Sequence, residues 1–143
     1  MVHRFPIAVR FYELDPYSHL NHSVYIQYFE TARIDLLAEA GFDLTEMADR
    51  GRMIVVTEIR TRFLASATMG DEVVVETEVV DTKRVTTRWR QRMYRDGELI
   101  AEQDLFAAMT NLGGRPVRLL PELVAALEPY RVDEPSEKTD EKG

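Results

Sequence analysis

The sequence predicts an α+β domain in which one long helix packs against a curved antiparallel sheet of about five strands. Apolar residues between positions 23 and 40 recur at three- and four-residue steps, as they do on one face of a helix. Four later segments alternate in steps of two, as half-buried strands do. The helix would be ~27 Å long and a ten-residue strand ~33 Å, so the sheet can cover the apolar stripe of the helix.

The first element is a mixed apolar and polar run over residues 2–11, which favours a strand. Asp15-Pro16 then interrupts the pattern, because proline lacks an N–H group and disfavours a helical conformation at the residue before it. Residues 13–22 are therefore expected to form a turn or loop. The loop carries polar side chains of several kinds: Glu13, Asp15, His19, Asn21 and His22.

The long helix is expected over residues 23–40. Asn21 and Ser23 are both suitable N-caps, and Gly41 is a suitable C-terminal stop. Its apolar stripe consists of Tyr25, Tyr28, Phe29, Ala32, Leu36 and Leu37.

The remaining elements follow from a change of period. Residues 43–51 predict a short helical segment, and the predicted strands lie at 55–63, 72–79, 85–94 and 99–109. The turns between them, at Gly70-Asp71, Asp81-Thr82-Lys83 and Asp96-Gly97, are short, which indicates an antiparallel meander. A short helix is predicted over 119–127. The domain is assigned to residues 1–128, and the polar residues 129–143 are expected to form a disordered tail.

Composition places the chain among soluble globular proteins of one domain, with 143 residues, 45% hydrophobic and 30% charged. It has no run of ~20 apolar residues that would cross a bilayer and no secretory signal. It also has no cysteine, which excludes disulfides and thiolate metal sites. These features favour a cytoplasmic protein without a membrane partner. A net charge of −7 argues against a nucleic-acid partner.

One segment runs against this acidic balance. Residues 83–95 contain six basic residues and no acidic one. Such a local stripe suits a compact anionic ligand, and the alternative is a solvated strand face.

The loop before the helix carries the chemistry. Asp15 can act as a general base or a nucleophile, and the first helical turn has unpaired N–H groups that can hold an oxyanion. The expected donors are the backbone amides of His22, Ser23 and Val24. Alternatively, Asp15 only begins an Asp-Pro turn and the histidines cap the helix. No metal site or cofactor is expected.

Residues 9–33, from Val9-Arg10-Phe11-Tyr12-Glu13-Leu14-Asp15 to Tyr25-Ile26-Gln27-Tyr28-Phe29-Glu30-Thr31-Ala32-Arg33, resemble the opening of hotdog-fold acyl-CoA thioesterases of the 4-hydroxybenzoyl-CoA thioesterase type. Residues 62–71 and the turn at Gly114-Arg115-Pro116 add to the resemblance, which covers about residues 5–127. In two places the chain departs from the family pattern: Glu13 stands where Asp is common, and Phe11 aligns with a common Tyr.

The resemblance implies a hotdog fold and hydrolysis of an acyl-CoA, with Asp15 as catalytic carboxylate and His22 at the oxyanion position, where its side chain also assists. It further implies a homo-oligomer, at least a dimer and by resemblance a tetramer. Basic residues should line the groove for CoA, with arginine forks binding its phosphates. The candidates are Arg60, Arg62, Lys83, Arg84 and Arg88. A thioesterase for acyl-carrier protein and a non-catalytic acyl-CoA-binding module are the alternatives.

Overall fold

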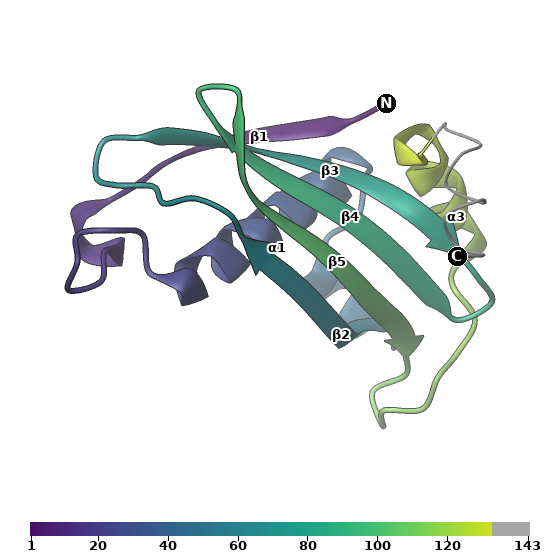
Figure 1. The fold of residues 1–143 in the computed structure, drawn as a ribbon. Coiled ribbons are helices and arrows are strands. Elements are labelled where there is room, and N and C mark those ends of the chain that lie inside the picture. The colour runs from purple at the N-terminus through teal and green to yellow at the C-terminus, as the bar shows by residue number, and fades with distance from the viewer. Residues whose placement is uncertain (133–143) are drawn as a thin grey trace.

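The computed structural model describes residues 1–132, which form one five-stranded sheet, three α-helices and two short 3₁₀ turns (Figure 1). The end of the expected tail, residues 133–143, lies outside the described residues. The strands are β1 (His3–Ala8), β2 (Met53–Phe63), β3 (Glu72–Thr82), β4 (Thr86–Arg95) and β5 (Glu98–Thr110). The helical elements are η1 (Phe11–Glu13), α1 (His22–Glu39), α2 (Leu44–Asp49), α3 (Pro121–Leu127) and η2 (Glu128–Tyr130).

The sheet has the strand order β1-β3-β4-β5-β2, and every neighbouring pair is antiparallel. The two hairpins β3–β4 and β4–β5 confirm part of the predicted meander. The predicted short turn at Gly70-Asp71 does not form a third hairpin, because β2 pairs with β5 and not with β3. Figure 1 shows the strands curving over one side of α1. With 18 residues α1 is the longest helix, but it does not form the helical layer alone, because α2 and α3 pack beside its C-terminal half.

The ends of α1 are set by local sequence. Asn21 is the N-cap, since its side-chain Oδ1 accepts a hydrogen bond from the Ser23 amide at 3.0 Å. At the other end Gly41 has a φ of +97°, and the Phe42 amide donates to the Leu37 carbonyl at 2.8 Å. This is the glycine-dependent arrangement that satisfies the last carbonyls of a helix, and it confirms the expected stop.

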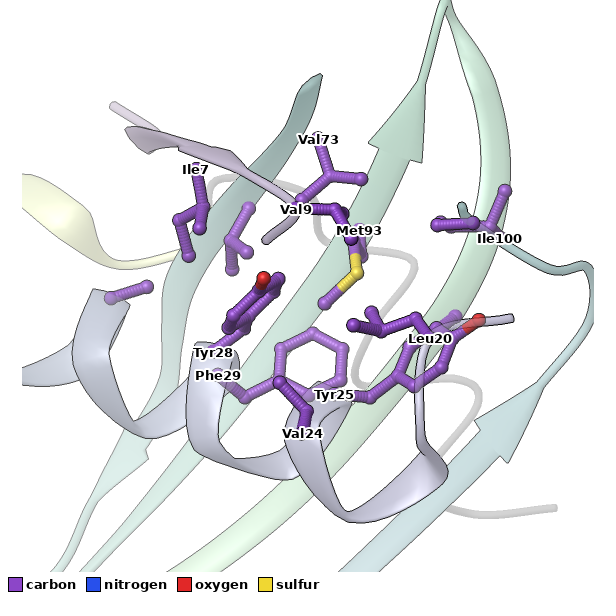
Figure 2. Close-up of a cluster of buried hydrophobic side chains, with 14 residues drawn as sticks. Ile7, Val9, Leu20, Val24, Tyr25, Tyr28, Phe29, Val73, Met93 and Ile100 are labelled. Carbon is purple, nitrogen blue, oxygen red and sulfur yellow. The ribbon is translucent and has the colours of Figure 1, made fainter. Parts of the chain in front are cut away.

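The inner face of the sheet and α1 enclose the core. The first cluster surrounds Phe29 and Met93, which are fully buried, and Figure 2 shows the Met93 side chain directed at the Phe29 ring. The second cluster lies toward α3 and includes Leu36, Trp89 and Leu123. The alternation predicted for the third to fifth strands is confirmed by the buried inward residues.

Strand β2 differs from the half-buried strand predicted for it. It lies at the edge of the sheet, and most of its residues are exposed on both faces, including Val56, Ile59 and Phe63. Alternation of apolar residues indicates which side chains could be buried. It does not show that α1 packs more closely against β3 and β1 than against β2.

The packed chain continues past the expected boundary at residue 128. Tyr130 is 5% exposed, and its hydroxyl donates to Glu39 Oε2 at 2.7 Å. The Val132 amide donates to the Val79 carbonyl, so this segment is fixed to β3. No helix within residues 1–132 is long and apolar enough to cross a membrane.

Candidate functional site

The loop between η1 and α1 holds Asp15 in a fixed turn. Its Oδ1 accepts hydrogen bonds from the amides of Tyr17, at 2.8 Å, and His19, at 3.1 Å. The Asp15 amide in turn donates to the His19 carbonyl at 2.8 Å. Within residues 1–132, Oδ2 accepts no hydrogen bond. The turn interpretation and the catalytic interpretation are therefore compatible: one oxygen orients the carboxylate and the other is available for chemistry.

The N-terminus of α1 follows directly, and its amides are not equivalent. The Ser23 amide donates to Asn21 Oδ1, and the Val24 amide donates to the Asn21 carbonyl at 2.8 Å. The His22 amide donates to no acceptor within residues 1–132. Of the three expected oxyanion donors, Ser23 and Val24 are thus already occupied by the helix cap, which leaves His22.

Aromatic rings surround this helix end. Phe63, the last residue of β2, contacts the His22 ring edge-to-face at 6.1 Å between centroids and the Tyr25 ring at 5.2 Å. The Tyr25 hydroxyl donates to the Ala65 carbonyl at 3.1 Å. Burial raises the pKa of Tyr25, and the nearby Asp15 carboxylate adds to that rise while Arg95 opposes it. The site therefore has one apolar wall at its β2 side.

A second cluster, formed by Arg10, Glu13 and Tyr28, connects the start of the loop to α1. The Tyr28 hydroxyl donates to Glu13 Oε1, and the Arg10 amide donates to the same oxygen at 2.9 Å. Burial works to raise the pKa of Glu13, but these hydrogen bonds and the Arg10 charge lower it below its usual value. Burial and the Glu13 carboxylate raise the pKa of Tyr28. Glu13, which stands where the family commonly has Asp, thus connects η1 to α1 through these hydrogen bonds.

The connection from β2 to β3 forms the other side of the loop. The Leu20 amide donates to the Ala67 carbonyl at 2.7 Å, and Thr68 Oγ1 donates to the Ser18 carbonyl at 2.9 Å. Arg95 donates to the Ser66 carbonyl. An open hollow is present where these segments meet, lined by Tyr17, Ser18, His19, Ser66, Ala67, Thr68 and Arg95. The loop that bears Asp15 therefore borders a space open to a ligand.

The arginines expected to bind CoA do not gather at this loop. Arg60, Arg62 and Arg88 lie on the outer face of the sheet and pair with Glu58 at 2.5 Å, Glu102 at 3.6 Å and Asp104 at 3.4 Å, respectively. Arg60 and Arg88 also lie over the Phe106 ring, at 5.8 and 5.2 Å. These pairs favour the solvated-face interpretation for the three arginines.

Lys83 and Arg84 occupy the β3–β4 turn, and their side chains make no ion pair within the described chain. They lie at the end of β4 opposite Arg95. Ten residues of strand separate the two ends by about 30 Å. Within one protomer these cations are therefore remote from Asp15.

In the sequence, Arg33 stands only within the segment of family resemblance, and no role was predicted for it. This α1 residue is only 9% exposed, and its Nη1 donates to Gln91 Oε1 at 2.8 Å and Gln103 Oε1 at 3.0 Å. A signal was present in the strands, because Gln91 and Gln103 stand at inward positions between apolar residues. Buried amides need hydrogen-bonding partners.

No three His, Asp or Glu side chains within residues 1–132 are grouped so that they could hold a metal ion.

Residues 9–127 match the family model described as the thioesterase-like superfamily. A chloroplast acyl-acyl carrier protein thioesterase of Arabidopsis thaliana is 28% identical over 82% of this chain, which spans 63% of that longer protein. An acyl-CoA thioesterase of Haemophilus influenzae is 27% identical over 85% of this chain and 91% of its own.

Solved structures share the fold. A hypothetical protein of Thermus thermophilus superimposes with a TM-score of 0.83 at 31% identity, over 89% of this chain and 98% of its own. A 1,4-dihydroxy-2-naphthoyl-CoA thioesterase of Synechocystis superimposes with a TM-score of 0.84 at 14% identity, over 89% and 96%. The second likeness concerns the fold alone.

Proposed function

The chain belongs to the thioesterase-like superfamily and has the hotdog fold of its thioester hydrolases, and from this premise we propose that it hydrolyses acyl-CoA with Asp15 as the catalytic carboxylate. One observation carries the proposal. Asp15 holds one oxygen in backbone hydrogen bonds and leaves the other without a partner, in a loop that leads into a helix whose first amide, that of His22, is also without an acceptor in the described chain.

The proposed reaction uses these two groups together. The thioester carbonyl oxygen lies at the His22 amide, where the N–H group and the helix dipole stabilise the negative charge of the tetrahedral intermediate. Asp15 Oδ2 takes a proton from water as the water oxygen bonds to the carbonyl carbon. The C–S bond then breaks, and the proton passes to the CoA thiolate. In the alternative route Oδ2 itself attacks the carbonyl carbon, and the C–S bond breaks to give an anhydride and the CoA thiolate. Water then opens the anhydride, which releases the free acid, restores the Asp15 carboxylate and supplies the proton that the thiolate takes up.

We expect the enzyme to be an oligomer, because β2 presents a long edge with exposed apolar residues such as Val56 and Ile59. An unpaired edge of this kind favours pairing with another strand. Antiparallel pairing of two β2 edges would place the partner's β3–β4 turn at the same end of the joined sheet as the first protomer's α1 N-terminus. The tetramer and the cytoplasmic location stay predictions.

Sedimentation equilibrium tests the oligomer. A dimer or larger species should persist at micromolar concentration, and Ile59→Lys, which places a charge on the β2 edge, should shift it toward monomer. The matched control is Thr31→Lys on the exposed side of α1, with no expected shift. A wild-type protein that is monomeric at this concentration would contradict the edge-pairing proposal.

The catalytic role of Asp15 is tested by Asp15→Asn, which keeps an Oδ1 acceptor for the Tyr17 and His19 amides and removes the base. We expect kcat for the best acyl-CoA to fall by about 10²–10⁴-fold, with the circular-dichroism spectrum unchanged. Asp43→Asn is the matched control, since Asp43 Oδ1 accepts from the Thr45 and Glu46 amides in a similar turn. Near-wild-type hydrolysis by Asp15→Asn would show that Asp15 is only a turn residue.

The second candidate is a thioesterase for acyl-carrier protein, favoured by the likeness to the Arabidopsis protein. Comparing kcat/KM for one acyl group on CoA and on carrier protein separates the two. The remaining alternative, a non-catalytic acyl-CoA-binding module, predicts saturable binding without thiol release.

A further inference from the structure

Glu13 is a carboxylate that joins the start of the Asp15 loop to the buried face of α1. Its side chain is 11% exposed, and a charged group withdrawn from water to this extent needs hydrogen-bond partners in compensation. Oε1 accepts from the Tyr28 hydroxyl and, at 2.9 Å, from the Arg10 amide. Oε2 accepts from Arg10 Nη1 at 3.3 Å. The carboxylate is therefore held in one position by donors from two elements.

Tyr28 gives this contact a rigid support. It lies six residues after His22 on α1, is 3% exposed, and belongs with Phe29 and Met93 to the first core cluster (Figure 2). Side chains in a close-packed core occupy defined rotamers, so the Tyr28 hydroxyl has a fixed place relative to the helix. The bond between this hydroxyl and the Glu13 carboxylate thus ties residue 13 to the body of α1.

The main chain of Glu13 closes the loop onto the helix cap. Its carbonyl accepts from the Asn21 amide at 2.9 Å. Asp15 lies two residues along one arm of the loop, and His22 directly follows Asn21 on the other arm. The Asp15 amide joins the arms again where it donates to the His19 carbonyl at 2.8 Å. Residue 13 is therefore a fixed point shared by the proposed catalytic carboxylate and by the start of α1.

We propose that Glu13 is a positioning residue for hydrolysis: held by Tyr28, it sets the place of the Asp15 carboxylate relative to the His22 amide. The inference rests on the proposed function for its catalytic meaning, whereas the connection between Tyr28 and the loop does not depend on it. Hydrolysis needs both reacting groups at the thioester at once. A displacement of ~1 Å between such groups can lower a rate by about 100-fold.

Tyr28→Phe tests the link, because it removes one hydroxyl and keeps the buried ring. The matched control is Tyr130→Phe at the other end of α1, where a buried tyrosine donates in the same way to Glu39 Oε2, at 2.7 Å. Each variant loses one hydroxyl–carboxylate bond, so both should lower the urea midpoint of unfolding similarly. Only Tyr28→Phe should lower kcat, by about 10- to 30-fold, with KM within about twofold of wild type, since positioning acts in the transition state. Equal kcat values for the two variants would overturn the proposal.

A conservative series at Glu13 supplies the second set of variants. Glu13→Gln keeps an Oε1 acceptor for the Tyr28 hydroxyl and should retain kcat within about threefold, whereas Glu13→Ala should lose at least as much as Tyr28→Phe. Adding Tyr28→Phe to Glu13→Ala should lower kcat no further, because both changes break the same link. Losses that multiply in the double variant, or wild-type kcat in Glu13→Ala, would contradict a shared link.

The background of Asp15→Asn shows whether the link acts through Asp15. In this background Tyr28→Phe should leave the residual thiol release unchanged, because the carboxylate whose place it sets is gone. An equal fold-loss in the Asp15→Asn and wild-type backgrounds would show that Tyr28 acts elsewhere, and would overturn the positioning role.

Hydrogen–deuterium exchange followed by mass spectrometry tests the connection without catalysis. Peptides over residues 13–22 should exchange at least about fivefold faster in Tyr28→Phe than in the wild type, because the Asp15 and Asn21 amides lose their fixed acceptors. Tyr130→Phe should leave these peptides unchanged. Unchanged exchange in Tyr28→Phe would overturn the connection, whether or not the protein is a thioesterase. Faster exchange in a protein that releases no thiol from any acyl-CoA would support the connection and refute the proposed function.

Discussion

The inner and outer faces of the sheet come from alternate residues of the same strands, yet they carry different chemistry. On the inner face Val73, Val75 and Met93 are fully buried against α1. On the outer face charges of opposite sign alternate across the strands. The register places Arg4 of β1 opposite Glu76 of β3, and Arg62 of β2 opposite Glu102 of β5, and both pairs form ion pairs, at 3.0 and 3.6 Å.

The difference between the two faces indicates where a ligand could bind. Opposite charges in neighbouring strands neutralise one another, so the outer face holds little net charge for an anionic ligand despite its arginines. Within residues 1–132 the buried basic side chains are His3 and Arg33. One hollow lies beside the Asp15 loop and another beside Arg33. Reactive and binding groups are thus expected where the inner face meets an edge or a helix end.

The largest expected effect on stability comes from deleting one phenylalanine ring, and it should differ between the two faces of the sheet. Phe29→Ala removes a fully buried ring beside Met93 (Figure 2) and should lower the free energy of unfolding by about 3–5 kcal/mol. Phe106→Ala removes an outer ring that contacts Arg60 and Arg88, and should cost about 1–2 kcal/mol. Urea unfolding at one fixed protein concentration measures both. Equal losses would show that the outer face is buried, for example in an oligomer.

A smaller effect is expected from the polar layer of the inner face. Gln91 accepts from Arg33 and donates to the Phe29 carbonyl at 2.8 Å and to Thr77 Oγ1 at 3.0 Å. Gln91→Leu leaves part of the buried guanidinium unpaired and should cost about 2–3 kcal/mol. Adding Arg33→Met should recover about 1 kcal/mol of that loss, because the unpaired charge is then gone. Strictly additive losses in the same unfolding assay would show that the two side chains are not coupled.

The fold was predictable because its signals are local. Period two in the segments of β3, β4 and β5, the Gly97 turn and the Asn21 cap each depend on neighbouring residues, and the structure retains them. The place of β2 at the sheet edge was not predictable in this way. It results from pairing β2 with β5, 49 residues apart at Thr57 and Phe106, where the Thr57 hydroxyl donates to the Phe106 carbonyl.

The site was predictable only in part. Asp-Pro and the N-cap pattern located the Asp15 loop and the start of α1. Which amides of the first helical turn are available to a ligand depends on Asn21. Its side-chain oxygen accepts a hydrogen bond from the Ser23 amide, and its carbonyl accepts one from the Val24 amide. Arg33 was missed because an arginine between apolar helix positions usually extends to solvent. Its burial depends on two glutamines from strands that the helix meets only in the folded chain.

The smallest expected effect concerns Lys83 and Arg84, whose side chains make no ion pair within residues 1–132. If the β3–β4 turn of one protomer binds the nucleotide of a CoA held by the other, Lys83→Ala with Arg84→Ala should raise KM for acyl-CoA about three- to tenfold and leave kcat nearly unchanged. Contacts remote from the thioester bind ground state and transition state alike, so their loss is a loss of uniform binding.

The matched control for this pair is Arg92→Ala, which removes an outer-face arginine 3.9 Å from Glu78 and should leave KM unchanged. An N-acetylcysteamine thioester, which lacks the nucleotide phosphates, should be hydrolysed equally by the double variant and the wild type. Raising the salt concentration should increase the wild-type KM for acyl-CoA and narrow its difference from the double variant, because ions screen exposed charges over about 8–10 Å. An unchanged KM for acyl-CoA in the double variant would show that Lys83 and Arg84 do not bind CoA. They would then be solvated surface residues, as the ion pairs of Arg60, Arg62 and Arg88 already favour for those three arginines.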